Sequence, residues 1–359
     1  MIKTTRCLTT LCACFCLARP VLAWNAEGHM VVAQIAYNHL DPEVKAKCDT
    51  LIAVPVYQSS SLNSNFVTAS VWADDIKSFT SAYNAQHYIN IPISLDGYPT
   101  NSFVIDPTNV VTAIQQHIAT LQNPAATLSN QAVALRFLLH FVGDIQQPLH
   151  CTTGIATNKP TGDLGGNTFS LNGAWSNLHS LWDAGGGYLN DSISRSPFTS
   201  ASRTILSNKA AVSEAAYPYT LSVGVIPDPM DWAQEGREIA RTNSYVGITP
   251  NTTPSVSYTN AAQATTVQRM AIGGQRLAKL LNTIFVTNAP NLIAVAQTNG
   301  DFNLSWGAVS GRSYRVQCKP LVTDAVWSNL TDITAFTNSI SYTDSMAPPQ
   351  RFYRVIVVN

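Results

Sequence analysis

Two histidine–aspartate pairs constrain this chain more than any other feature of its sequence. In "LLHFVGDIQQPLH", His140 and Asp144 are four residues apart, and "NLHSLWD" repeats this spacing with His179 and Asp183. On a helix, residues four apart share one face, with Cβ atoms roughly 5–6 Å from each other. A neutral imidazole and a carboxylate placed in this way suit a borderline-soft cation such as zinc. With His150 nearby, the pairs predict metal sites that the fold must assemble.

A single His-x-x-x-Asp pair is more often a surface hydrogen bond than a metal site. Two such pairs with His150, in a chain without a set of thiolate ligands, favour metal binding instead. The chain has only seven histidines, and His39 and His117 lie in amphipathic stretches without an acidic residue at a useful spacing. We expect these two histidines to be structural.

Further candidates lie outside the two pairs. "VWADDIKS" contains Asp74 and Asp75, "AQHYINIP" contains His87, and residues 162–167 form the glycine-rich stretch "GDLGGN". Each is weak alone, because adjacent aspartates usually mark a helix start or a solvated corner. A glycine-rich backbone could approach a ligand closely, but by itself it indicates only a turn.

The first 23 residues read as a secretory signal peptide. Lys3 and Arg6 precede the apolar run 8–18, and "VLA" ends in a small residue suited to cleavage before Trp24. The run is far shorter than the roughly 20 residues that cross a bilayer, and no later stretch qualifies. We expect a secreted or periplasmic protein without a membrane span. A lipid-modified Cys14 in "LCAC" is the alternative, although "VLA" is the better cleavage site.

Residues 24–285 are predicted to be mainly helical. The spacing of apolar residues predicts helices over 28–40, 109–123, 129–147 and 265–285. Ser129 or Asn130 is expected to cap the third helix, and Pro148 to end it. Two long segments rich in Gly, Pro and Asn, residues 151–175 and 243–262, are expected to be loops.

The character of the sequence changes at residues 286–291. Short alternating runs separated by turn residues predict strands over 302–306, 313–318, 326–330, 339–344 and 351–358. This part, residues 286–359, contains no histidine. We expect a small β-sandwich-like C-terminal domain suited to adhesion or sorting, with a partner that the sequence does not identify.

Charge and cysteine content exclude some classes of function. Only 12% of the residues are charged, against about 25% in average soluble domains, and the net charge is zero. No global basic field would therefore hold nucleic acid by counterion release, so an anion would need a local site. Beyond the leader, Cys48, Cys151 and Cys318 are odd in number and widely spaced. They form no disulfide framework, and whether two of them pair is left open.

Taken together and in order, "WNAEGH", "WADD", "HYIN", "HFVGDIQQPLH", "GDLGGN" and "HSLWD" resemble the S-one/P-one nucleases. These are single-strand-specific zinc nucleases that include mung bean nuclease. The resemblance covers about 24–285 and is specific because nine potential ligands fall in register. It implies a multi-helix, mainly α fold of the zinc nuclease and phospholipase C type, and we expect the protein to be a monomer. It also implies hydrolysis of single-stranded DNA and RNA to 5′-phosphorylated products, with 3′-nucleotidase activity.

The resemblance implies three Zn²⁺ ions. The first would be held by Asp74, His87, His140 and Asp144, and the second by His150, His179 and Asp183. The third would be held by Trp24, through its α-amino nitrogen and carbonyl oxygen, by His29, and by Asp144 as a bridge to the first. A free α-amine titrates at about 7.7–8 and is a competent donor once deprotonated. Cleavage before Trp24 would therefore create a metal ligand.

The resemblance also implies residues that act on the substrate. Asp74 would orient the attacking water, and Lys77, one helical turn further on, would neutralise charge growing on the phosphoryl oxygens. Asn167 would add a contact to phosphate or substrate. Tyr88 would stack a nucleobase, which suits a single strand, although a Tyr packed in the core is the open alternative. Asn90 stands where some members carry an acidic base-reading residue, so the base preference is left open.

Two other functions compete with a nuclease. Secreted bacterial phospholipases C share the three-zinc architecture, but their second zinc resembles a His-x-x-x-Glu site, whereas this chain has His179 and Asp183. The "GDLGGN" stretch also favours the nuclease. A non-enzymatic zinc-binding adhesin that uses the β domain would need metals without an open coordination position.

Overall fold

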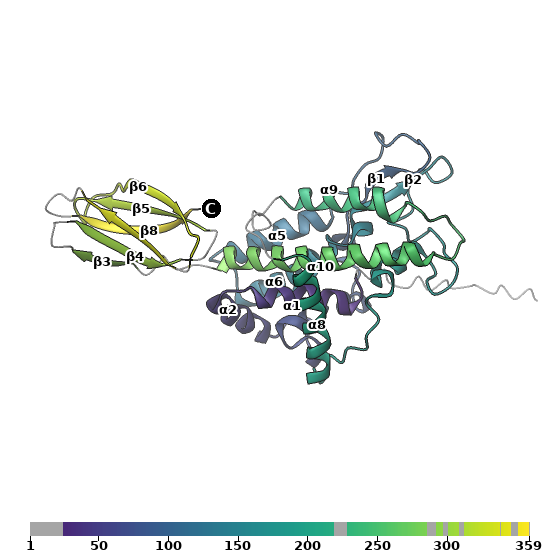
Figure 1. Cartoon of the computed structure of the whole chain (residues 1–359), viewed down its shortest axis with the longest axis horizontal. Helices are drawn as coiled ribbons and strands as arrows, with labels where there is room; N and C mark the ends of the chain where they lie inside the picture. Colours follow the sequence, from purple (N-terminus) through teal and green to yellow (C-terminus); the bar gives the residue numbers. More distant parts are fainter. Residues whose placement is uncertain are drawn as a thin grey trace, which may run out of the picture.

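The computed structural model describes residues 24–218, 228–285, 292–296, 301–308, 312–337, 339–345 and 351–358. The chain is mainly α up to Phe285 and all-β beyond it, as the sequence predicts (Figure 1). The predicted signal peptide lies outside the described residues. Within them, no helix is both long and apolar enough to cross a membrane.

Most of the helical body is α-helix. The α-helices are α1 (Ala26–Asn38), α2 (Pro42–Ala53), α3 (Phe66–Ala69), α4 (Trp72–Asp75), α5 (Val110–Gln122), α6 (Leu128–Asp144), α7 (Leu178–Asp183), α8 (Ser200–Ala216), α9 (Pro229–Ile239) and α10 (Val256–Phe285). The shorter helical segments are η1 (Ser61–Asn63), η2 (Ile76–Ser78), η3 (Asn84–His87), η4 (Pro148–Cys151), η5 (Gly185–Gly187) and the π-helical η6 (Ala240–Ser244).

The longest helix, α10, runs along the helical body and packs against α1, α6 and α8 (Figure 1). Two adjacent glycines allow this close approach. A Cβ on Gly274 would lie 2.4 Å from the Cβ of Ile35 in α1, and one on Gly273 would lie 2.8 Å from the side chain of Gln146. The pair therefore brings α10 directly against the helices that carry the candidate ligands.

Two predicted helix starts are wrong. The cap of α6 is Thr127, not Ser129 or Asn130, because Thr127 has extended backbone and its side chain accepts from the amide of Asn130. The last predicted helix begins at Val256, nine residues before the predicted start at 265, so part of the expected loop 243–262 is helical. Tyr258 and Ala262 are buried in that first part. Their burial anchors this part of the helix, where polar residues obscure the helical spacing of the apolar residues in the sequence.

A short parallel pair of strands, β1 (Ile91–Ser94) and β2 (Thr152–Ile155), lies beside the helices. The sequence predicted a loop where β2 forms. β1 follows His87 and β2 follows His150, with Ile91 opposite Thr152. The pairing therefore holds two candidate ligand segments side by side.

The C-terminal strands are β3 (Ile293–Ala296), β4 (Phe302–Gly307), β5 (Ser313–Lys319), β6 (Ser328–Thr334), β7 (Ser339–Asp344) and β8 (Phe352–Val358). They form two three-stranded antiparallel sheets, ordered β3-β4-β7 and β6-β5-β8, beyond the end of α10 (Figure 1). Their core is separate from that of the helical body and contains Leu304, Trp306 and Tyr314. Arg312 donates a hydrogen bond to the carbonyl of Asn282 in α10.

Candidate metal centre

Three groups of His and Asp side chains converge among the described residues, each with ligand atoms within 4.8 Å of one another. The groups are His29, His140 and Asp144; Asp74, His87 and His140; and His150, His179 and Asp183. They contain every histidine and aspartate that the resemblance implies as a ligand. The other two histidines lie elsewhere: His39 contacts Glu214, and His117 stacks on Phe137 with ring centroids 4.7 Å apart.

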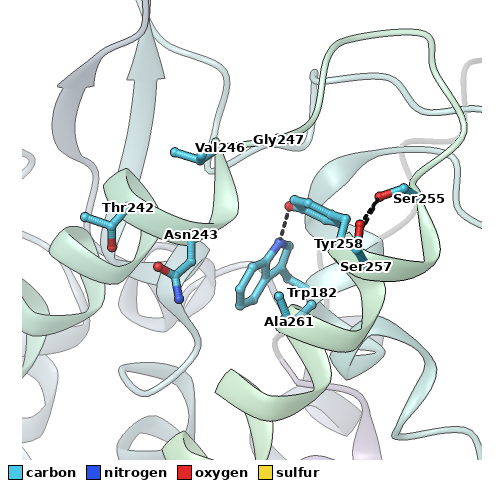
Figure 2. A pocket seen from close by; sticks show the side chains of 10 residues that line it. Trp182, Thr242, Asn243, Val246, Gly247, Ser255, Ser257, Tyr258 and Ala261 are labelled. Atoms are coloured by element: carbon cyan, nitrogen blue, oxygen red, sulfur yellow. Dashed lines mark hydrogen bonds between the residues drawn. The ribbon is translucent and has the colours of Figure 1, made fainter.

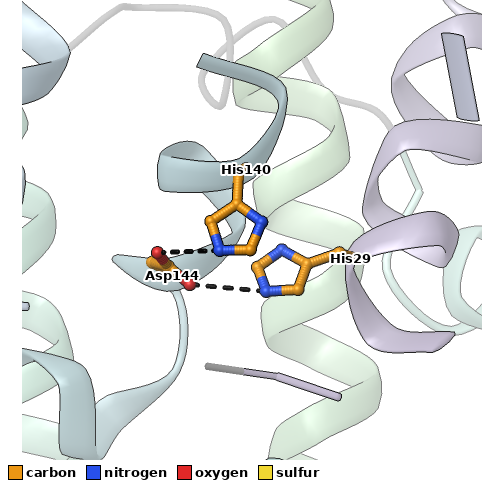
Figure 3. A group of neighbouring side chains, drawn as sticks. All are labelled: His29, His140 and Asp144. Carbon is orange, nitrogen blue, oxygen red and sulfur yellow. Dashed lines mark ion pairs between the residues drawn. The ribbon is translucent and has the colours of Figure 1, made fainter. Parts of the chain in front are cut away.

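Asp144, at the end of α6, faces both His29 of α1 and His140 of α6 (Figure 3). Its Oδ1 is 3.4 Å from Nε2 of His29, and its Oδ2 is 3.3 Å from Nε2 of His140. Oδ2 also lies 2.9 Å from Nδ1 of His87. The rings of His29 and His140 stack with centroids 3.7 Å apart. The two oxygens of one carboxylate thus face different histidines, an arrangement that could bridge two cations.

The turn from α4 into η2 brings Asp74 and Lys77 to the same place. Oδ1 of Asp74 is 3.5 Å from Nε2 of His140 and 3.9 Å from Nδ1 of His87. Nζ of Lys77 is 2.7 Å from the same oxygen, and both side chains are buried. The group therefore includes a fixed ammonium beside a carboxylate.

Backbone carbonyls orient the histidines. Nδ1 of His140 donates to the carbonyl of Ser70 at 2.6 Å, Nδ1 of His150 to that of His87 at 2.7 Å, and Nδ1 of His179 to that of Gly165 at 2.7 Å. Each bond fixes the tautomer that carries the proton on Nδ1, so the lone pair is on Nε2. Nε2 of His150 lies 3.9 Å from Oδ1 of Asp183, and Nε2 of His179 lies 3.5 Å from Oδ2 of the same carboxylate. Metal-binding histidines are commonly oriented by such hydrogen bonds from the ring nitrogen that does not bind the metal.

The glycine-rich loop supplies one of these carbonyls. Gly165 has a φ of +61°, and a Cβ there would lie 2.3 Å from the carbonyl oxygen of Leu149. The buried carboxylate of Asp163 holds the loop by accepting from the amides of Gly154 and Gly166. Asn167 is half-buried, and its Nδ2 donates to the carbonyl of Leu164 at 2.7 Å. The loop therefore orients His179 and presents Asn167 two residues further on.

Electrostatics favour a cation here. Burial lowers the pKa of His29, His87 and His150, so their imidazoles are neutral at pH 7. Burial raises the pKa of Asp144 to about 8, and it also raises the pKa of Asp183. Buried carboxylates and neutral imidazoles together are stabilised by a bound divalent cation.

Two opposing effects act on Asp74. Burial alone would raise the pKa of Asp74, but His140 and Lys77 hold it well below its usual value. The carboxylate is therefore ionised at neutral pH and can accept a hydrogen bond.

Unsatisfied atoms give an independent test of fit. Both ring nitrogens of His29, Nε2 of His150 and Oδ1 of Asp144 are buried and make no hydrogen bond among the described residues. Such atoms are destabilising in a protein interior unless something else binds them. The donor set, with its nitrogen and carboxylate oxygen ligands, suits zinc.

Trp24 docks beside these groups. Its side chain is fully buried, and its indole N–H donates to the carbonyl of Gly143 at 3.0 Å. The next amide, of Asn25, donates to the carbonyl of Asp183 at 3.1 Å. A Cβ on Gly28 would lie 2.8 Å from Cβ of Trp24, so the absence of a side chain there allows the approach. The first described residue therefore lies against the helix end that carries Asp144.

The predicted base-contacting residues flank His87. Tyr88 is half-buried, and its carbonyl accepts from the amide of Val110 at 3.1 Å. Asn90 is also half-buried and directly precedes β1. Among the described residues, Cys48, Cys151 and Cys318 are buried and form no disulfide bond.

A pocket of about 360 Å³ is lined in part by Trp182 of α7 and Tyr258 of α10 (Figure 2). The indole N–H of Trp182 donates to the hydroxyl of Tyr258 at 2.9 Å. None of the candidate ligands lines this pocket. The contact anchors α7, which carries His179 and Asp183, to α10.

The sequence of this chain is similar to those of known proteins. The family model described as S1/P1 Nuclease matches residues 24–286. Endonuclease 2 of Arabidopsis thaliana is 29% identical over 283 residues, which are 73% of this chain and 90% of that protein. Nuclease P1 of Penicillium citrinum is 30% identical over 168 residues, 45% of this chain and 57% of that protein.

A solved structure of the alpha toxin from Clostridium absonum is also similar. It has a TM-score of 0.42 and 11% identity, with 94% of each chain covered. A similarity at this level carries no functional argument. The family match, by contrast, spans the whole helical body and all three His/Asp groups. This chain therefore belongs to the S1/P1 nuclease family.

Proposed function

We propose that this nuclease is a zinc-dependent endonuclease that hydrolyses single-stranded DNA and RNA to 5′-phosphorylated products and also acts as a 3′-nucleotidase. The observation that supports it most is Asp144, whose two oxygens lie 3.4 and 3.3 Å from nitrogens of His29 and His140. A carboxylate between two such groups suits a cluster of metal ions that acts on one phosphate.

We assign three zinc ions to these groups. Asp74, His87, His140 and Asp144 would hold the first, His150, His179 and Asp183 the second, and Trp24, His29 and Asp144 the third. Zinc bound there would polarise the phosphodiester and stabilise the charge that develops on its oxygens. This assignment requires a free α-amine on Trp24.

The remaining roles belong to the chain's own side chains. The ionised Asp74 is suited to accept a hydrogen bond from the attacking water and so to orient it. Lys77, whose Nζ is 2.7 Å from that carboxylate, places a buried positive charge where it can neutralise phosphoryl oxygens. The amide of Asn167 can donate to a phosphate oxygen. These donors are held in place before substrate binds, which is what makes them effective in a transition state.

Selection of a single strand would come from base stacking. The half-buried ring of Tyr88 can stack an unpaired base, and stacking tolerates any base. Asn90, two residues on, is the candidate for a contact to the base edge. Because the net charge of the chain is zero, such local contacts, and not a basic surface, would provide the affinity.

We propose that the protein is secreted or periplasmic and acts as a monomer after removal of residues 1–23. Residues 24–285 would form the nuclease domain, and residues 286–359 a β-sandwich-like appendage. The separate core of the strands supports this division.

The substrate assignment can be tested on purified mature protein. We expect hydrolysis of single-stranded DNA, RNA and 3′-AMP, loss of activity with a zinc chelator, recovery with added zinc, and no action on phosphatidylcholine. Good hydrolysis of phosphatidylcholine without cleavage of single strands would favour the phospholipase C alternative. Zinc binding without turnover of any of the four would favour the adhesin.

Deletion of residues 286–359 is expected to leave turnover of short oligonucleotides nearly intact. No candidate ligand lies beyond Asp183, and the strands have a core of their own. The melting temperature is expected to fall slightly, because the contact from Arg312 to Asn282 is lost. Turnover and circular dichroism should be measured together. A large loss of turnover in a truncated protein that folds would mean that the appendage helps to build the active site.

A further inference from the structure

Gln147 lies in the turn between α6 and η4 and is fully buried. Its Nε2 donates to Oδ1 of Asp183 at 2.7 Å, and its Oε1 accepts from the amide of Leu149 at 2.6 Å. The second bond caps η4, the turn that carries His150. One amide side chain therefore joins two of the three ligands in the His150, His179 and Asp183 group.

The backbone of Gln147 adds two further connections. Its N–H donates to the carbonyl of Asp144 at 2.9 Å, and its carbonyl accepts from the N–H of His150 at 2.9 Å. The residue thus lies between ligands from both parts of the metal centre. Gln147 lies within the "HFVGDIQQPLH" motif, but the motif predicts no role for it, because an amide side chain is neither a typical metal ligand nor a charged group.

The orientation of the amide is determined by its partners. The N–H of Leu149 can only donate, so Oε1 must face it, and the NH₂ group must face Asp183. An amide NH₂ is always a donor, so it supports Asp183 as an acceptor. The NH₂ group of Gln147 donates to Oδ1 of Asp183, whereas Oδ2 of Asp183 lies 3.5 Å from Nε2 of His179.

We propose that Gln147 is a positioning residue for the second zinc site, which holds Asp183 so that Oδ2 is directed to the metal. The inference rests on the proposed function only in taking Asp183 as a zinc ligand. Hydrogen-bond donors behind metal ligands typically account for about 10–100-fold in metal affinity. The loss of this donor should therefore weaken one zinc site and leave the others unchanged.

The neighbouring Gln146 has a different role despite equal burial. Its Oε1 accepts from Arg269 and Arg276, which also contact Glu235. No hydrogen bond from its side chain to a candidate ligand occurs among the described residues. The positioning role thus belongs to Gln147 through its geometry, and not to buried glutamines in general.

The test is Gln147→Met in the mature, full-length protein, with zinc affinities measured by competition with a chromophoric chelator. We expect one of the three affinities to fall about 10–100-fold. Gln275→Met is the matched control, because Gln275 is also buried and its Nε2 donates to the carbonyl of Tyr217 at 2.9 Å, away from the ligands. The control should melt at a lower temperature and keep all three affinities.

Gln147→Glu covers the case in which Gln147→Met fails to fold. It keeps an acceptor for the amide of Leu149 but replaces the donor to Asp183 with a carboxylate oxygen. We expect it to weaken the same zinc site. If either folded variant keeps the affinities of the unmodified protein, the inference is wrong.

A double-mutant cycle shows whether the effect passes through Asp183. Asp183→Ala should weaken the same site, and adding Gln147→Met should cause little further loss, because the two residues act as a unit. If the two losses of zinc affinity instead multiply in the double variant, the proposal is wrong. The proposed function is tested separately. If the protein binds three zinc ions and loses zinc affinity on Gln147→Met, but does not cut single strands, the proposed function is wrong and the inference about Gln147 still holds.

Discussion

Replacement of Asp144 by alanine is expected to abolish turnover and to remove more than one equivalent of zinc per chain. The carboxylate faces His29, His140 and His87 at distances between 2.9 and 3.4 Å, so its loss removes a ligand from two of the assigned zinc sites at once. Its removal would also leave Asp74 as the carboxylate beside His140 and His87. Metal analysis of the purified variant and a single-strand cleavage assay measure the two effects.

Asp75→Ala is a suitable control for this substitution. Asp75 is adjacent to a candidate ligand, but its two oxygens accept from Arg195 at 2.9 Å each, and it belongs to none of the three groups. We expect this variant to be less stable and to keep its zinc content. If Asp144→Ala lost only one zinc ion and kept substantial turnover, Asp144 would not bridge two sites.

A mature protein that begins Met-Trp24, with the methionine retained, is expected to lose at least about a hundredfold in turnover, or about 2.7 kcal/mol of transition-state stabilisation. The added residue converts the α-amine of Trp24 into an amide, which is a very poor metal donor at neutral pH. Trp24 itself should still dock, because its buried indole is held by the carbonyl of Gly143. We therefore expect a folded protein that keeps the two better-ligated zinc ions.

Protease removal of the added methionine provides the control in the same sample. If the free amine is the ligand, trimming to Trp24 should restore both the third zinc ion and the rate. An extended protein with three zinc ions and full activity would contradict this role. It would also return attention to lipid modification at Cys14, which leaves Trp24 within the chain.

The predicted His and Asp side chains do converge in three groups, but only part of that convergence follows from local spacing. Four-residue spacing alone identified His140 with Asp144 and His179 with Asp183, because a helix turns local spacing into proximity. The stacking of His29 on His140 depends on how α1 packs against α6, which no local pattern encodes. The roles of the carbonyls of Ser70 and Gly165 were missed for the same reason, since a backbone oxygen has no sequence signature.

The fold was predictable where burial follows a regular spacing. The helical body and the C-terminal strands show such spacing, and their class is correct. The start of α10 was missed because buried Tyr258 and Ala262 are separated by polar residues on an exposed face. β2 was missed because Thr152–Ile155 is short and pairs with a strand 61 residues away at Ile91. Long-range pairing decided that segment, not its own preference.

From the parallel pairing of β1 and β2, we expect the candidate metal ligands to come together late in folding. Parallel strands cannot be joined by a tight turn, and here α5 and α6 lie between them in the chain. The contact between His150 and the carbonyl of His87 spans 63 residues of the chain, and such non-local contacts form slowly. Zinc would then bind to a site that the folded chain has already assembled. We therefore expect zinc to slow unfolding much more than it accelerates refolding.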